Sequence, residues 1–293
     1  MPLNVAVLAN LKRNAPKYEG MPADAWDDLD SDITVDSLVA ALQAGGHRAT
    51  FLEGNLSLIE ELPRLKPDIC FNISEGHWGD SRESHVPALL EMLRQPYTGS
   101  GVLTLALTLD KPMTKRVLAF HDLPTPAFQV FERADEPLDD DLRFPLFVKP
   151  SREGTGMGVS GQSIVHDERE LREQLREQLA RYQQPILVER FIRGREVTVG
   201  VIGNLRPPVA RRMPDDETAR RVLGGLHFLP PLEVDFRAYP ETEGGVYTNR
   251  MKTEWAHDFH YLCPAPLDAA LVEQLNRLTA AVFRVTGCRA VAR

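Results

Sequence analysis

The chain has 293 residues, with 34 Lys and Arg against 42 Asp and Glu, which gives a formal net charge of −8. This length exceeds what one small core needs and predicts two or three subdomains. The negative charge argues against a nucleic-acid partner, because phosphates require a basic face. Two local basic pairs, Arg211-Arg212 and Arg220-Arg221, are expected to be solvated surface or loop.

The three cysteines, Cys70, Cys263 and Cys288, are widely separated and lack the spacing of metal ligands. Their positions predict free thiols, with Cys70 and Cys288 buried, in a reducing compartment. No apolar run reaches membrane-spanning length, and the N-terminus lacks a basic segment followed by an apolar one. We therefore expect a cytoplasmic protein with no membrane partner.

The first part of the chain alternates strands with helices. Buried strands are predicted at 4–9, 49–52 and 68–73. Asp32 is predicted to cap the first intervening helix, with Ile33, Leu38, Ala41 and Leu42 on its apolar face. A short helix is predicted at 58–62. This β-α-β-α-β order predicts a right-handed parallel sheet in an α/β, Rossmann-like domain.

The rest of the chain mixes both element types. Helices are predicted at 84–93, 102–107, 113–120, 167–182 and 268–286, the last two capped by Asp167 and Asp268. The last helix is expected to bury Leu271, Leu275, Leu278, Ala281 and Val282. Strands are predicted at 127–131, 146–149, 186–189, 197–202, 232–236 and 290–292. A hairpin turn is predicted at Gly203-Asn204 and a long loop at 240–260.

A lysine at the end of an apolar strand leads into a glycine-rich loop, Lys149 to Ser160. The ammonium of Lys149 is a compact charge suited to phosphate oxygens. Gly154, Gly156 and Gly158 allow backbone amides to close around an anion, and Thr155 adds a hydroxyl. The alternative is a solvated hairpin turn. The loop lacks the Gly-Lys-Ser/Thr that opens a helix in a Walker A motif, so a nucleotide site of another kind is indicated.

Seven groups of short motifs occur in order along the chain. They are Pro96-Tyr97-Thr98-Gly99-Ser100-Gly101, Leu109-Asp110-Lys111 with Thr114-Lys115, Phe147-Val148-Lys149-Pro150 with the glycine-rich loop, Val188-Glu189-Arg190-Phe191-Ile192, Gly194-Arg195-Glu196-Val197-Thr198-Val199, Cys263-Pro264-Ala265 and Gly287-Cys288-Arg289. Together they resemble the ATP-grasp superfamily, and within it the D-alanine–D-alanine ligases, over about residues 68–293. The resemblance implies α+β architecture in the ATP-binding part. It also implies three domains: 1–108, a central ATP-grasp subdomain at 109–190, and a C-terminal ATP-grasp subdomain at 191–293.

The family's ATP-binding roles can be carried over position by position. Lys111 and Lys149 resemble the two lysines that hold the α and β phosphates, and Lys252 resembles the loop lysine that reaches the γ-phosphate. The loop residues implied to contact phosphate are Glu153, Gly154, Thr155 and Gly156. Glu189, Arg190 and Ile192 resemble the segment that pairs with adenine, and Glu196 the acid that binds the ribose hydroxyls. The alternatives are ordinary strand-end salt bridges for Glu189 and Glu196, and a solvated Lys252.

The reaction that the resemblance implies is amide-type ligation of an amino acid or small carboxylate through an acyl phosphate. Arg293 aligns with the arginine that steadies the oxyanion, and Thr155 and Lys252 are further candidate catalytic residues. The family continues beyond this arginine into a strand and a segment that supply magnesium ligands. We therefore expect no metal ligands within 1–293, an incomplete C-terminal domain, and no ligation by this stretch alone. A nucleotide-binding protein or fragment without catalysis is the alternative.

The substrate side departs from the family. The serine- and acid-containing element after the first strand is replaced by Leu8 to Arg13, and an acidic loop follows at 26–32. D-alanine as substrate is therefore in question. Glu75 or His77 is expected to contact the substrate amine or to move a proton, the alternative being hydrogen bonds that stabilise their loop. A homodimer is common in the family.

Overall fold

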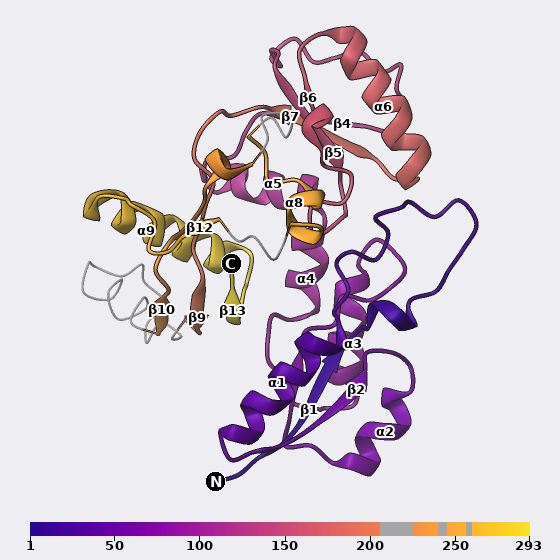
Figure 1. Ribbon diagram of the computed structural model, residues 1–293, viewed down its shortest axis with the longest axis vertical. Helices are drawn as coiled ribbons and strands as arrows, with labels where there is room; N and C mark the ends of the chain where they lie inside the picture. Colours follow the sequence, from indigo (N-terminus) through magenta and orange to yellow (C-terminus); the bar gives the residue numbers. More distant parts are fainter. Residues whose placement is uncertain (206–224, 240–244, 256–259) are drawn as a thin grey trace.

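The computed structural model describes residues 1–205, 225–239, 245–255 and 260–293. Figure 1 shows three groups of elements: the N-terminal sheet and helices at one end, a four-stranded sheet with a long helix at the other, and the C-terminal strands and helix to one side. The basic pairs Arg211-Arg212 and Arg220-Arg221 lie outside the described residues. The domain limits 1–108, 109–190 and 191–293 remain a prediction.

The N-terminal sheet is parallel, as the sequence predicts. Strand β1 (Asn4–Ala9) lies between β2 (Arg48–Glu53) and β3 (Ile69–Asn72). Five of the six β1 residues are buried because the strand is covered on both faces. One face packs against α2 (Leu58–Leu65) and α3 (His85–Met92), with Leu8, Leu58 and Leu90 in the same core.

The cap of helix α1 (Asp32–Ala44) lies one residue earlier than predicted, at Ser31. The Ser31 side chain accepts from the Thr34 amide, because Ser31 keeps an extended backbone while Asp32 is already helical. The predicted apolar face is also wrong: Ile33 is 78% exposed, and Val35 is the buried residue of the helix.

Two helices connect the N-terminal and central sheets: α4 (Val102–Leu109) and α5 (Lys111–Phe120). The side chain of Asp110 accepts a hydrogen bond from the Met113 amide at 2.9 Å and so caps α5. The helix therefore begins two residues before the predicted start at Met113. This cap places Lys111 in the first turn of α5.

The central sheet is antiparallel, with strand order β4-β7-β5-β6. Its strands are β4 (Phe128–Phe131), β7 (Ile186–Arg190), β5 (Leu146–Pro150) and β6 (Ile164–Val165). Helix α6 (Glu168–Tyr182) is capped by Asp167, whose side chain accepts from the Glu170 amide as predicted. Leu171 and Leu175, one turn apart, pack on the sheet and fix the strand ends that bear the site.

The C-terminal part holds two three-stranded sheets. One has the order β12-β11-β8, from Tyr261–Leu262, Leu232–Val234 and Val197–Thr198; the other has the order β10-β9-β13, from Leu226–Phe228, Val201–Gly203 and Ala290–Ala292. The single strand predicted at 197–202 is thus divided between two sheets. The hairpin turn predicted at Gly203-Asn204 is wrong, because Gly203 still pairs with Leu226 and Ala290.

Two helices and the 3-10 segment Phe236–Ala238 complete this part. The loop predicted at 240–260 contains helix α8 (Asn249–Thr253), while 240–244 and 256–259 lie outside the described residues. Helix α9 (Ala269–Val285) is capped by Asp268 as predicted, but Ala280 and Phe283 are its buried residues and Leu271 is exposed. The 3-10 segments that bear on the site are Arg82–Ser84 and Gly161–Ser163. No helix in the described ranges is long and apolar enough to span a bilayer.

Candidate active site

The strand pair β5–β7 carries an ion pair at its centre. Lys149 Nζ lies 2.5 Å from Glu189 Oε1, and Lys115 Nζ of α5 lies 2.7 Å from Glu189 Oε2. Burial disfavours the charged carboxylate, but the charges of Lys149 and Lys115 outweigh it and lower the pKa of Glu189. Glu189 is therefore an ionised group shared by two lysines, which matches the salt-bridge alternative for this residue.

Lys111 approaches the same place from the start of α5. Its Nζ donates to the backbone carbonyl of Glu153 in the glycine-rich loop. Burial, and next the charge of Lys149, lower the pKa of Lys111 to about 8. Lys111 and Lys149 thus form a close pair of cations beside the loop, an arrangement suited to a polyanion.

The glycine-rich loop has a backbone that most side chains disfavour. Thr155, Gly156 and Gly158 have φ values of +49°, +76° and +74°. A Cβ on Gly156 would lie 3.2 Å from the Asn249 amide nitrogen and 3.5 Å from Lys252 Nζ. The loop continues into a 3-10 turn and β6 rather than an α-helix, so it is not a P-loop.

A cavity of about 260 Å³ lies at the end of β7 and is lined by Glu189, Arg190, Ile192 and Glu196 among others. The Arg190 amide donates to Ala127 at 2.9 Å and the Phe191 amide to Pro145 at 3.1 Å, so both amides are already engaged. Burial raises the pKa of Glu196, opposed by the charges of Lys252 and Lys149. Glu196 therefore belongs to the same electrostatic cluster as the lysines.

Lys252 lies on α8, opposite the glycine-rich loop. Its Nζ is 4.6 Å from the centre of the Tyr247 ring, and burial lowers its pKa. The positive charge of Arg293, an exposed residue after β13, adds to this lowering. The structure thus brings Lys252 near Glu196, Gly156 and Arg293.

Glu75 and His77 follow β3 on the N-terminal side. Burial, and then the charges of Glu83 and Asp28, raise the pKa of Glu75 to about 8, so it is protonated at neutral pH. Burial lowers the pKa of His77, whose Nε2 is buried without a hydrogen-bond partner among the described residues. At neutral pH Glu75 is therefore a carboxylic acid and His77 an uncharged imidazole.

Several charged residues around the loop were given no role from the sequence. Lys115 could have been found, since it lies one helical turn after Lys111 on α5. Arg82 could not: its Nη2 lies 3.0 Å from both Asp28 Oδ2 and Glu153 Oε2, contacts that span 54 and 71 residues. Asp24 could not be found either, because the residues that donate hydrogen bonds to it, Gly158 and Tyr182, lie 134 and 158 residues away in the sequence.

Several known proteins are similar to this chain in sequence. A family model described as D-ala D-ala ligase C-terminus matches residues 117–215. The uncharacterized protein y4sG of Sinorhizobium fredii is 35% identical over 266 residues, which cover 88% of this chain and 71% of that protein. The D-alanine–D-alanine ligase of Syntrophotalea carbinolica is 34% identical over 253 residues, or 86% and 72% of the two chains.

Solved structures give the same result for the fold. The D-alanine–D-alanine ligase of Bacillus anthracis complexed with ATP matches with a TM-score of 0.66 at 21% identity, over 99% of this chain and 79% of that one. The fold is that of the ATP-grasp enzymes, which confirms the resemblance stated from the motifs. The chain belongs to the D-alanine–D-alanine ligase family. It is accordingly an ATP-dependent carboxylate–amine ligase.

Proposed function

We propose that this protein joins the carboxylate of an amino acid or small acid to an amine through an acyl phosphate. The observation that carries the proposal is the close pair Lys111 and Lys149, held against the glycine-rich loop beside Glu196. Two ammonium groups in a partly desolvated site offset the charge of a triphosphate. D-alanine, named for the relatives, is the first substrate to test.

ATP is proposed to lie between the central sheet and the C-terminal sheets. The base occupies the cavity at the end of β7, beside Arg190 and Ile192, and the ribose hydroxyls bond to Glu196. Glu189 keeps Lys149 and Lys115 in place and forms the wall next to the base. Because the amides of Arg190 and Phe191 are engaged, the base uses the remaining groups of this segment. Lys111, Lys149 and the loop residues Glu153, Gly154, Thr155 and Gly156 hold the phosphates.

The chemistry follows from this placement. A carboxylate oxygen of the first substrate attacks the γ-phosphorus, the bond to the bridging oxygen breaks, and ADP leaves. The amine of the second substrate then attacks the acyl carbon and phosphate departs. Lys252 and Thr155 steady the transferred phosphoryl group, and Arg293 faces the oxyanion. His77, uncharged at neutral pH, accepts the proton that the amine loses, while protonated Glu75 donates a hydrogen bond.

Magnesium is the ion expected for such a reaction. Within 1–205, 225–239, 245–255 and 260–293, no three side chains of His, Cys, Asp or Glu are grouped so that they could hold a metal. These residues do not fit a magnesium site by themselves, and no step is derived through the ion.

Two broader properties are also part of the proposal. The free cysteines Cys70, Cys263 and Cys288 are those of a protein kept in a reducing cytoplasm. The exposed apolar side chains Ile59 and Met92 on the N-terminal helices, with Leu56 in the turn before α2, are the candidates for a homodimer surface. Light scattering of the purified protein would measure the dimer directly.

A panel assay tests the function. The full protein is incubated with ATP, magnesium and each of the D- and L-amino acids, and phosphate release and amide product are measured. We expect at least one amino acid, with D-alanine tested first, to stimulate both. ATP binding with no stimulation by any acid–amine pair would instead favour a nucleotide-binding protein without turnover.

A further inference from the structure

A second cavity, of about 530 Å³, lies on the N-terminal side of the glycine-rich loop. It is formed by the loop around Tyr18–Trp26, the segment around His77–Arg82, the loop residues Arg152 and Glu153, and the end of α6. Lys111, Lys149, Glu196 and Lys252 do not line it. Lys111 contacts the Glu153 carbonyl, whereas the Glu153 side chain contacts Arg82, so this residue separates the cavity from the phosphate site.

Aromatic rings form one wall. Trp26 lies edge-on to Trp78, with ring centres 5.3 Å apart, and edge-on to His77 at 5.4 Å; Tyr18 lies 5.5 Å from Trp78. All of these rings line the cavity, and an aromatic face in contact with the cavity favours a cation there. Trp26 has a φ of +67°, a costly backbone for a bulky residue, which the surrounding structure maintains. Its indole N–H is satisfied by the Pro16 carbonyl, which leaves the ring as its contribution to the wall.

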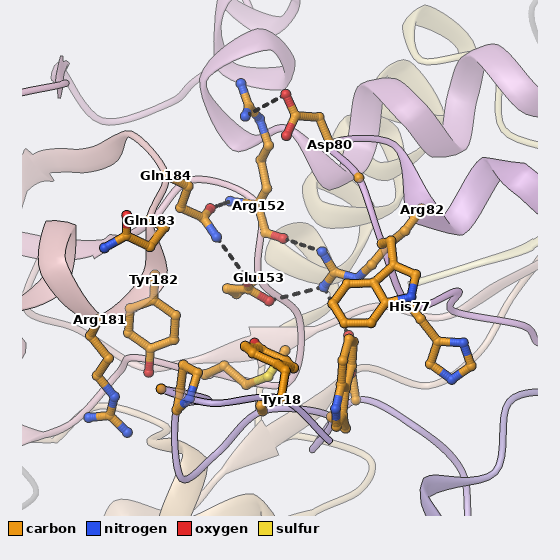
Figure 2. A pocket seen from close by; sticks show the side chains of 18 of the residues that line it. Tyr18, His77, Asp80, Arg82, Arg152, Glu153, Arg181, Tyr182, Gln183 and Gln184 are labelled. Carbon is orange, nitrogen blue, oxygen red and sulfur yellow. Dashed lines mark hydrogen bonds and ion pairs between the residues drawn. The ribbon is translucent and has the colours of Figure 1, made fainter. Parts of the chain in front are cut away.

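The opposite wall carries both acids and arginines. Figure 2 shows Arg82 directed at Glu153 and at the backbone of Arg152. Arg82 is shared by two carboxylates, those of Asp28 and Glu153. Arg152 is likewise shared by Asp80 and Asp110, at 2.8 and 2.9 Å. The lining acids Glu19, Asp28, Asp80 and Glu153 therefore outnumber the lining arginines Arg82, Arg152 and Arg181 by one, and Arg181 is itself paired with Asp24.

A buried carboxylate, that of Asp28, also belongs to this cavity. The side chain of Asp28 is only 3% exposed and lines the cavity. Its Oδ2 accepts from Arg82, but its Oδ1 has no hydrogen-bond partner among the described residues. An unpaired carboxylate oxygen in a partly dry site is stabilised by a positive charge nearby.

We propose that this cavity binds an organic cation, an ammonium or guanidinium group on a carbon skeleton, between the aromatic rings of Tyr18, Trp26 and Trp78 and the carboxylate of Asp28. Two sources share this chemistry: the cationic side chain of the ligated amino acid, and a separate small molecule. Cation binding stands apart from the ligase reaction, and only the first source rests on the proposed function.

The test uses tryptophan fluorescence, because two of the three tryptophans, Trp26 and Trp78, line the cavity. Choline, its uncharged carbon isostere dimethylbutanol, L-arginine and L-lysine are titrated into the full protein without ATP. We expect saturable responses to the cations, with dimethylbutanol binding at least about tenfold more weakly than choline. Equal binding of choline and dimethylbutanol, or no saturable response to any cation, would overturn the proposal.

Variants locate the binding. Asp28→Asn should weaken choline binding and leave dimethylbutanol binding unchanged. Trp78→Ala, at a 53% exposed position that tolerates truncation, should weaken both; it also keeps the test valid if Asp28→Asn fails to fold. Phe120→Ala, on the exposed end of α5, is the control and should bind as wild type. Unchanged choline binding in Trp78→Ala would contradict the assignment.

Phosphate-release assays then distinguish the sources. Stimulation by arginine or lysine, inhibited competitively by choline, assigns the cation to the substrate side chain. Choline binding that leaves every amino-acid reaction unchanged assigns it to a separate ligand. Both results support the cation site, and the titration without ATP remains decisive if the ligase reaction itself is not observed.

Discussion

Lys149 and Glu189 are 40 residues apart in the sequence and yet form an ion pair of 2.5 Å across adjacent strands of the central sheet. The antiparallel register sets Lys149 opposite Leu187 and Phe147 opposite Glu189, so the two side chains meet diagonally. Lys115 binds the other oxygen of Glu189, which fixes the carboxylate between two cations. This geometry holds the Lys149 ammonium in one place, which would reduce the ordering that the proposed binding of ATP requires.

Replacing Lys149 should therefore weaken ATP binding. Lys149→Ala removes a charge-assisted contact to phosphate, worth about 1.5–3 kcal/mol, so we expect ATP affinity to fall about 10- to 100-fold by calorimetry. Glu189 keeps Lys115, and the fold is preserved. Lys17→Ala, at an exposed lysine, should bind ATP as wild type. Wild-type affinity in Lys149→Ala would exclude the phosphate role.

ATP binding should also depend on pH through Lys111. Because the pKa of Lys111 is lowered from 10.5 to about 8, the free protein loses this charge as pH rises through 8. The triphosphate binds the charged form, so binding above this pH takes up a proton and affinity falls by up to about tenfold per pH unit. Calorimetry at pH 7 to 10 measures this. Lys111→Arg, which stays charged, should show a shallower fall, and identical profiles would refute the assignment.

The same pKa shift has a consequence for stability. Between pH 8 and 10.5 the unfolded chain binds more protons at Lys111 than the folded chain does. The contribution of this group to the free energy of unfolding therefore rises with pH over that interval. As pH rises, ATP affinity should thus fall, whereas the contribution of Lys111 to the free energy of unfolding should increase.

Substitution of Gly156 tests whether the close approach between the glycine-rich loop and α8 matters for turnover. Gly156→Ala places a Cβ 3.2 Å from the Asn249 nitrogen at a positive φ, whereas Gly46→Ala meets a similar φ with no atom within 4 Å. Each substitution should lower the free energy of unfolding by about 1–2 kcal/mol through backbone strain. Only Gly156→Ala should also reduce ATP-dependent turnover. Equal turnover in the two variants would show that the contact with Asn249 and Lys252 is unimportant.

Asp24 holds the loop from the N-terminal side. It accepts from the Gly158 amide at 2.8 Å, the Tyr182 hydroxyl at 2.6 Å and Arg181 at 3.1 Å. Asp24→Ala should speed hydrogen exchange of peptides covering 154–160 by about 10- to 100-fold, since bonds to a charged acceptor are lost. Asp135→Ala, whose side chain is 80% exposed, is the control and should exchange as wild type. Unchanged exchange in Asp24→Ala would show that this contact does not restrain the loop.

The sequence predicts those parts of the molecule that depend on local pattern. The apolar run at 4–9 predicts a buried strand. The order of an apolar strand, Lys149 and three glycines likewise predicts the loop from the sequence alone. The caps at Asp167 and Asp268 are predicted for the same reason. At Ser31 and Asp32 two good caps are adjacent, and local pattern cannot choose between them.

Contacts between residues far apart in the chain could not be predicted from the sequence. Asp24 and Gly158 are 134 residues apart, and nothing in either segment indicates the other. The strand at 197–202 keeps one alternating pattern although its halves join different sheets. Glu189 was predicted from a motif, but its sharing by Lys115 depends on how α5 lies against the sheet.

The central claim is that one ATP molecule lies among Lys111, Lys149, Glu189 and Glu196. A crystal structure of the full protein with a non-hydrolysable ATP analogue tests it most directly. We predict phosphate oxygens within hydrogen-bond distance of Lys111 and Lys149, the ribose at Glu196, and the base in the cavity beside Arg190 and Ile192. An analogue bound elsewhere, with these four side chains unengaged, would contradict the account.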